Sequence, residues 1–138
     1  MKYLLLTLML IGRLSLAKDG LSLVAYSGVY DIYADDKYTQ EIIKDTLYDV
    51  RFYFFYHIDD VDMRYRDFDK IKAGDFDMNY AFIDCKEKYL GVYSFYTFDK
   101  DRDLKGYGGS TELEDINMYR VNNETSAGYH IFNYFCEK

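Results

Sequence analysis

The chain has 138 residues, of which 24 are acidic and 17 are basic, so its formal net charge is −7 at pH 7. This excess of negative charge repels phosphate backbones and argues against nucleic-acid binding, and it disfavours anionic membrane surfaces for the same reason. A basic protein partner is electrostatically allowed.

The first seventeen residues have the pattern of a signal peptide. Lys2 supplies a positive charge, residues 4–11 form an apolar run, and the small residues Ser15 and Ala17 occupy the two positions that signal peptidase recognises. The apolar run is too short to span a bilayer core of about 30 Å. The sequence therefore predicts a cleaved signal peptide over residues 1–17 and a secreted protein. The alternative is a membrane anchor or a buried N-terminal helix.

The remaining residues, 18–138, have the length of a single domain. Without Lys2 and Arg13 this part keeps 15 of the 17 basic side chains against 24 acidic ones, so its formal charge is −9. It contains no run of eighteen apolar residues, and we therefore expect no membrane span.

The first predicted elements are a strand and a helix. Residues 21–34 predict a strand with a bulge at Gly28. Residues 36–48 are the one segment with a helical pattern, in which Thr39 is a candidate N-cap and three apolar residues fall on one side.

The most aromatic segment is RFYFFYHI, residues 51–58, which predicts a central strand covered on both faces. One face then carries Phe52, Phe54, Tyr56 and Ile58, and the other carries Arg51, Tyr53, Phe55 and His57. If the first face is packed, Phe54→Ala should cost about 3–5 kcal/mol, as other large-to-small core changes do. The alternatives are a lipocalin-like ligand cavity lined by these rings and an exposed aromatic recognition face.

Two further segments show the alternation of a half-buried antiparallel strand. They are residues 60–66 and residues 76–84, and the turn signal between them predicts a hairpin. In the second segment the dry face is expected to carry Phe76, Met78, Tyr80 and Phe82, and the wet face Asp77, Asn79 and Ala81.

Three strands complete the predicted sheet. Residues 89–98 are apolar on both sides and predict a central strand, and residues 112–121 and 129–136 predict two more, joined by a polar turn. About seven strands separated by turn signals predict an all-β fold, a compact antiparallel β-sandwich with one short helix. The alternatives are a small lipocalin-like barrel and an α+β fold.

Two covalent features are predicted. Cys85 and Cys136 are the only cysteines, and in an oxidising compartment they predict one disulfide that ties the C-terminal strand to the end of the strand over residues 76–84. Free or intermolecular thiols are the alternative. Asn123 begins an Asn-Glu-Thr sequon in a predicted turn, which predicts N-glycosylation in a eukaryotic secretory pathway; an unmodified turn is the alternative.

No catalytic, cofactor-binding or metal-binding residue is predicted. His57 and His130 lie in no nucleophile motif and have no metal-ligand spacing. Asp99 opens an Asp-x-Asp-x-Asp segment, but Leu104 and Ser110 stand where an EF-hand loop requires Gly and Glu. Acidic pairs of the kind that glycosidases use are expected by chance among 24 acids.

These observations favour a secreted, non-catalytic binding protein that engages a host protein or another extracellular protein. The composition has no Pro or Trp and is rich in residues with AT-rich codons, which suggests the genome of a virus or parasite and host-directed interference as the role. The runner-up is a lipocalin-like carrier of a small apolar ligand, which needs a cavity on the order of 300–1,000 Å³. A hydrolytic enzyme comes third. The sequence does not predict the oligomeric state.

Overall fold

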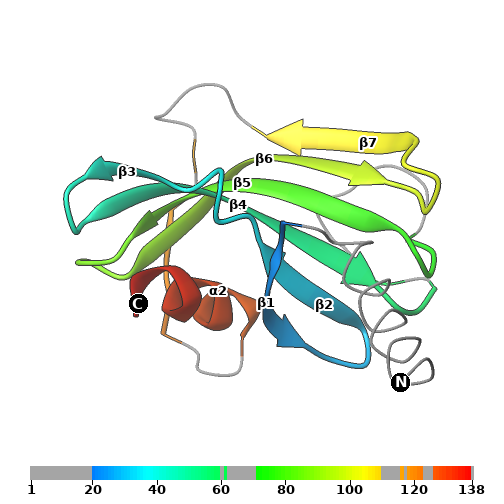
Figure 1. Ribbon diagram of the computed structural model, residues 1–138, viewed down its shortest axis with the longest axis horizontal. Helices are drawn as coiled ribbons and strands as arrows, with labels where there is room; N and C mark the ends of the chain where they lie inside the picture. The colour runs from blue at the N-terminus through cyan, green and yellow to red at the C-terminus, as the bar shows by residue number, and fades with distance from the viewer. Residues whose placement is uncertain are drawn as a thin grey trace, which may run out of the picture.

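The computed structural model of the protein describes residues 20–59, 61, 71–109, 116, 118–122 and 126–137. These residues form eight strands and one helix (Figure 1). In chain order the elements are β1 Ser22–Tyr26, β2 Tyr30–Ala34, β3 Gln40–Ile43, β4 Leu47–Tyr56, β5 Phe76–Asp84, β6 Tyr89–Phe98, β7 Leu104–Gly109, β8 Tyr119–Arg120 and α2 Ala127–Cys136.

All described strands belong to one antiparallel sheet, whose order is β1-β2-β4-β5-β6-β7. β3 pairs with the first residues of β4, and β8 pairs with the first residues of β6. The two ends of the order, β1 and β7, do not pair with each other among the described strands, so the sheet does not close into a barrel. The predicted all-β fold, an antiparallel sandwich with one short helix, is confirmed.

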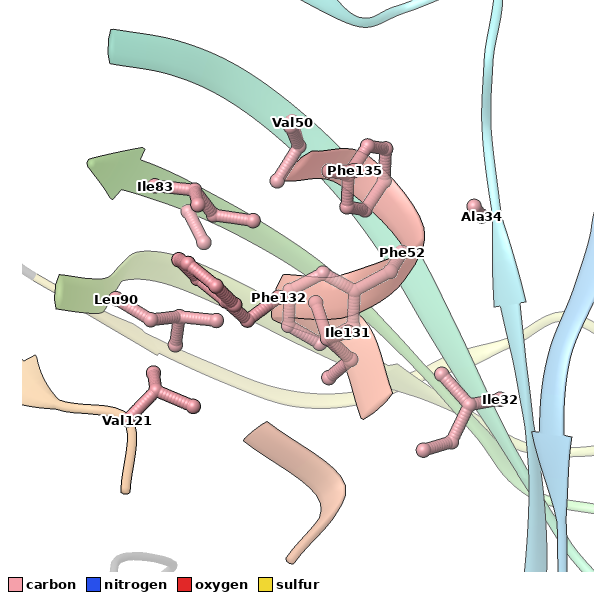
Figure 2. Close-up of a cluster of buried hydrophobic side chains, with 11 residues drawn as sticks. Ile32, Ala34, Val50, Phe52, Ile83, Leu90, Val121, Ile131, Phe132 and Phe135 are labelled. Carbon is pink, nitrogen blue, oxygen red and sulfur yellow. The ribbon is translucent and has the colours of Figure 1, made fainter. Parts of the chain in front are cut away.

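Helix α2 covers one face of the sheet and forms the hydrophobic core with it (Figure 1). Ile131, Phe132 and Phe135 point from the helix toward the sheet, where they meet buried side chains that include Phe52 and Leu90 (Figure 2). Their spacing of one and three residues puts all three on the same side of the helix. Burial of this side accounts for most of the helix's stability, because a ten-residue helix is marginal on its own.

The helix corrects the prediction of a strand over residues 129–136. Aromatic residues favour strands, and this segment has four of them. Ser126 caps the helix instead, since its hydroxyl accepts a hydrogen bond from Tyr129 N at 3.1 Å. In a helix, Ile131, Phe132 and Phe135 can all contact the sheet, which is distant in sequence. These tertiary contacts outweigh the local preference for a strand.

The helix predicted over residues 36–48 is also wrong, because this segment forms a β-hairpin. β3 ends at Ile43, and the chain turns back into β4 with a hydrogen bond from Thr46 N to Ile43 O at 3.0 Å. Asp45 has a φ of 54°, the left-handed conformation that Asp tolerates in tight turns. Ile42 and Ile43 are 52% and 54% exposed, so the apolar stripe that suggested a helix does not enter the core.

The single strand predicted over residues 21–34 is a hairpin of β1 and β2. Ser27 forms its turn, because the hydroxyl accepts from the N–H groups of Val29 and Tyr30 at 3.2 and 3.1 Å and donates to Tyr30 O at 2.9 Å. This turn stands where the sequence predicted a bulge at Gly28.

Two of the predicted strands are only partly covered by the described residues. The segment over residues 60–66 lies outside them apart from Val61. β5 pairs along its length with β4 and β6, so both of its edges are occupied and the predicted hairpin of residues 76–84 with residues 60–66 is wrong. The segment over residues 112–121 is described in part, and Tyr119–Arg120 within it form β8. The predicted central positions of β4 and β6 agree with the strand order.

β5 shows the predicted alternation with its two faces exchanged. The buried face, toward α2, carries Asp77, Asn79, Ala81 and Ile83, and the opposite, half-buried face carries Phe76, Met78, Tyr80 and Phe82. Asp77 is fully buried, and the core supplies its hydrogen-bond donors. Tyr56 donates to Oδ2 at 2.5 Å, and the hydroxyl of Thr97 donates to Oδ1 at 2.7 Å. A carboxyl group can therefore occupy the inner face because its polar atoms are satisfied there.

Removing one of these donors should destabilise the protein. In Tyr56→Phe the ring remains and the carboxyl group of Asp77 loses a hydrogen bond, so the free energy of unfolding should fall by about 1–3 kcal/mol. Urea denaturation measures this change. Tyr26→Phe is the matched control, because the Tyr26 side chain is 78% exposed and its hydroxyl can be solvated. A Tyr56→Phe protein as stable as the Tyr26→Phe control would contradict this role for the Tyr56 hydroxyl.

Candidate functional site

The face of the sheet that points away from α2 contains an open groove of about 1000 Å³. Side chains alternate between the two faces of a strand, so the groove receives the members of β4, β5 and β6 that do not enter the core. We call it the aromatic groove, and it is lined by Gly20, Leu21, Asp35, Lys37, Tyr38, Arg51, Tyr53, Phe55, Gly74, Phe76, Met78, Phe98, Lys100 and Arg102.

A row of stacked rings crosses the floor of the aromatic groove. Phe55, Phe76 and Phe98 are cross-strand neighbours on β4, β5 and β6. Each adjacent pair of rings is stacked with its centroids 5.2 Å apart. Tyr53 stacks on Phe55 along β4, with centroids 6.0 Å apart, and Tyr33 meets Phe55 edge-on at 5.5 Å. Cross-strand aromatic pairs of this kind stabilise a sheet, and their outer surface offers a flat apolar platform.

One wall of the groove is held by an ion pair between Arg51 and Asp35. The guanidinium Nε donates to Asp35 Oδ2 at 3.0 Å, and Nη1 donates to the hydroxyl of Tyr80 at 3.2 Å. The guanidinium carbon also lies 4.9 Å from the ring centroid of Tyr38 and 5.9 Å from that of Tyr53. Partial burial disfavours the charged form of Arg51, but the hydrogen bonds to Asp35 and Tyr80 outweigh this effect and raise its pKa. Arg51 is therefore a fixed cation that orients the rings around it.

A second set of polar contacts links the groove wall to the neighbouring strands. The hydroxyl of Tyr93 donates to Asp49 Oδ1 at 2.8 Å and lies 3.2 Å from the hydroxyl of Tyr38. Burial raises the pKa of Tyr93, and the hydrogen bonds to Tyr38 and Asp49 raise it further. A phenol in this environment stays protonated at neutral pH, so it positions Tyr38 rather than transferring protons.

The exposed charges of the aromatic groove have the opposite sign to the net charge of the chain. Lys37, Lys100 and Arg102 are exposed and line it, and Asp35, the acidic residue of its lining, pairs with Arg51. Asp99, beside Lys100, accepts hydrogen bonds from the backbone N–H groups of residues 101 and 103 at 2.8 and 3.0 Å, and so closes the β6–β7 turn. The groove is thus a local basic and aromatic surface on an acidic protein.

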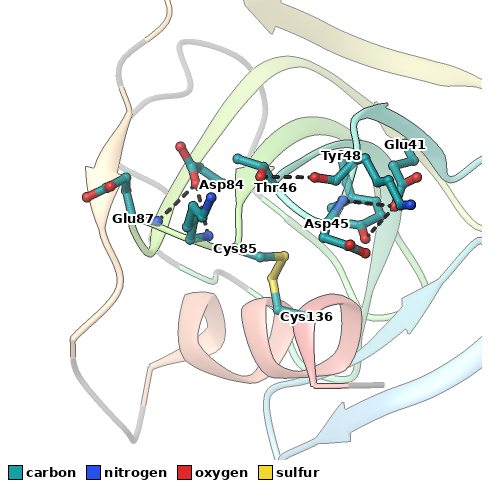
Figure 3. Close-up of a disulfide and its surroundings, with 10 residues drawn as sticks. Glu41, Asp45, Thr46, Tyr48, Asp84, Cys85, Glu87 and Cys136 are labelled. Atoms are coloured by element: carbon teal, nitrogen blue, oxygen red, sulfur yellow. Dashed lines mark hydrogen bonds between the residues drawn. A yellow bond between two sulfur atoms is a disulfide. The ribbon is translucent and has the colours of Figure 1, made fainter.

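The predicted covalent and histidine positions lie elsewhere. Cys85, directly after β5, is bonded to Cys136, the last residue of α2, with an S–S distance of 2.00 Å (Figure 3). This is the predicted pair, although its partner element is a helix where a strand was expected. Asn123 lies outside the described residues. His57 Nε2 is 3.0 Å from Asp31 Oδ1, and the exposed His130 lies beside the ring of Tyr129, so the two histidines occupy separate places.

The sequence prediction missed the charged part of the groove. The one available signal was Arg51, a charged residue within a strand of aromatic side chains, which predicts a nearby carboxylate. Ile58, which the alternation placed beside Phe52 and Tyr56, is 46% exposed and lies beyond the end of β4.

Comparison with known protein families, with curated proteins and with solved structures finds no match for this chain. Over the described ranges, no three His, Cys, Asp or Glu side chains are grouped closely enough to hold a metal ion. Nor does the described part of the chain contain a helix with the length and apolar character needed to cross a membrane.

Proposed function

We propose that the protein is a secreted, non-catalytic binding protein that holds an extended segment of an extracellular protein, such as a host protein, in the aromatic groove. The observation that carries this proposal is the stacked row of Phe55, Phe76 and Phe98 on a half-buried face of the sheet. Aromatic side chains on a rigid support contribute much of the binding energy at protein interfaces, because they bury a large area and lose little conformational entropy.

The charges around the groove favour an acidic or mixed-charge segment over the basic partner that the net charge alone suggests. Lys37, Lys100 and Arg102 are exposed on its lining. At physiological ionic strength the Debye length is about 8 Å, so a bound segment is affected mainly by the charges at the groove. The cations line it, whereas Asp36, Asp101 and Asp103 flank these cations in the sequence without lining the groove and reduce the preference. The net charge of the protein should still slow the approach of an acidic partner at low salt.

The polar groups of the groove support binding over catalysis. Arg51 is paired with Asp35, and Tyr93 is hydrogen-bonded to Asp49 and close to Tyr38, so these groups brace the walls. A general acid or base needs a pKa near the working pH, and the pKa values of Arg51 and Tyr93 are both raised away from it.

Substitutions in the groove should remove partner binding without unfolding the protein. The purified protein is tested against an array of extracellular domains, and each hit is measured again with Tyr53→Ala and Phe76→Ala. Each variant should weaken binding by at least about tenfold, as truncation of an aromatic hot-spot residue does. Lys100→Glu should also weaken binding, and its effect should shrink as salt is added.

The matched control is Tyr26→Ala, which removes an aromatic side chain of greater exposure, 78%, outside the groove. It should leave every hit unchanged. Melting temperatures show which variants remain folded. If folded Tyr53→Ala and Phe76→Ala proteins keep all of their partners, the aromatic groove is not the binding site.

A further inference from the structure

A second cavity lies between the inner face of the sheet and the first half of α2. Its volume is about 480 Å³, within the range of small-molecule sites. We call it the inner cavity, and it is lined by Phe52, Phe54, Asn79, Leu90, Val92, Phe95, Gly109, Tyr119, Ala127, Gly128 and Ile131. Most of these residues are apolar, and none of them carries a charged side chain.

Asn79 is the one amide side chain in the lining, and its Nδ2 lacks a hydrogen-bond partner in the described part of the chain. The side chain is buried, with an exposed fraction of 4%, and Nδ2 has no hydrogen-bond partner among the described residues. Buried polar groups are almost always paired, so a donor without a protein partner that faces a cavity is a natural point of contact for a ligand acceptor. Asp77, two residues away on the same face, shows the usual behaviour, because Tyr56 and Thr97 donate to it. The unpaired donor is therefore specific to the residue that lines the cavity.

The N-terminus of α2 provides a second polar feature of the inner cavity. Ala127 and Gly128 belong to the first turn of this ten-residue helix and line the cavity. The first N–H groups of a helix have no partner within it, and the positive end of the helix dipole attracts anions. Ser126 accepts from Tyr129 N, which satisfies one N–H group of that turn.

We propose that the inner cavity binds an amphiphile made of an apolar chain and one carboxylate group, such as a medium-chain fatty acid. The apolar chain would occupy the space among Phe54, Leu90 and Val92, and a carboxylate oxygen would accept a hydrogen bond from Asn79 Nδ2. The positive end of α2 favours an anionic head group over a cationic one. Binding would thus give Asn79 Nδ2 the acceptor that the described residues do not supply.

This site is separate from the aromatic groove. β4 contributes Phe52 and Phe54 to the inner cavity and Tyr53 and Phe55 to the groove, on opposite faces of the sheet. The two proposals can therefore fail independently, because groove variants should bind the amphiphile normally and cavity variants should keep their protein partners.

The test uses calorimetric titration of the oxidised protein with laurate and with dodecyltrimethylammonium, which has the same chain length and no hydrogen-bond acceptor. Laurate should bind and raise the melting temperature, and the cation should bind at least about tenfold more weakly. Asn79→Leu should weaken laurate binding by about tenfold to a hundredfold, the value of one hydrogen bond to a charged group. Without ligand, this variant should melt no lower than the wild type, because it removes an unpaired buried donor.

Val92→Phe is a second variant. Its larger side chain should fill the inner cavity and exclude laurate while Asn79 is retained. Tyr53→Ala, on the other face of the sheet, is the control and should bind laurate like the wild type. Failure of laurate to bind the wild-type protein would overturn the proposal, as would equal binding of the two amphiphiles or unchanged binding by Asn79→Leu. A ligand-free Asn79→Leu protein that melts well below the wild type would show that Asn79 has a structural role instead.

Discussion

Loss of the disulfide should lower the free energy of unfolding by about 4 kcal/mol. The Cys85–Cys136 bond joins residues separated by 51 positions, and a cross-link of this span removes that much chain entropy from the unfolded state. It also ties the C-terminal end of α2 to the end of β5 (Figure 3). Since α2 supplies Ile131, Phe132 and Phe135 to the core, a helix released at this end should also open more often.

The variant that tests this effect is Cys85→Ala combined with Cys136→Ala, which leaves no reactive thiol. Urea denaturation should show a lower midpoint and a steeper dependence on urea, because the unfolded chain without the cross-link exposes more surface. The wild-type protein under reducing conditions should lose a similar amount, which separates the effect of the bond from the effect of the substitutions. Equal stability of the double variant and the oxidised wild type would contradict the prediction.

The strands could be predicted from the sequence because their signals are local. Alternation over residues 76–84 and the aromatic run from Phe52 to Tyr56 both fall within single strands. Helix α2 could not, because its aromatic residues favour a strand when they are considered alone. The helix depends on an N-cap at Ser126 and on packing against β4 and β6, elements that are distant in sequence.

The orientation of β5 shows a second limit of prediction from the sequence. Alternation predicts that a strand has two different faces, and the polar character of Asp77 and Asn79 suggested that theirs was the wet face. The structure buries both. Asp77 is satisfied by Tyr56 and Thr97, which belong to the two strands on either side. These cross-strand partners allow the face with Asp77 to lie inside. Their positions depend on the register between strands, which cannot be read from the sequence of one strand.

The aromatic groove depends on the register between strands in the same way. Arg51 and Asp35 are sixteen residues apart, and Lys100 and Arg102 come from a turn on the far side of β5. The sequence showed a concentration of rings and an isolated arginine, which together allowed an exposed recognition face as one alternative. Only the strand order places Phe55, Phe76 and Phe98 next to one another and shows that the rings of residues 51–58 serve both the core and the groove.

Phe52 is the core residue whose truncation should be most damaging, and Phe54 provides a matched comparison on the same strand and face. Phe52 is 2% exposed and packs in the cluster with Ile131 and Phe132. Phe54 is only half-buried, and its ring stacks on Tyr30 with centroids 4.9 Å apart. The expectation from the sequence, a large loss at Phe54, therefore moves to Phe52.

Phe52→Ala should lower the free energy of unfolding by about 3–5 kcal/mol, because it removes a fully buried ring and leaves a cavity that the sheet and helix cannot fill. Phe54→Ala should cost less, about 1–2 kcal/mol, since its ring is only half-buried. Phe55→Ala, which follows Phe54 on β4 and lies on the groove face, should cost no more than Phe54→Ala. Urea denaturation of the three variants tests this order. A loss at Phe54 as large as the loss at Phe52 would contradict this order and would mean that the ring of Phe54 is packed as tightly as that of Phe52.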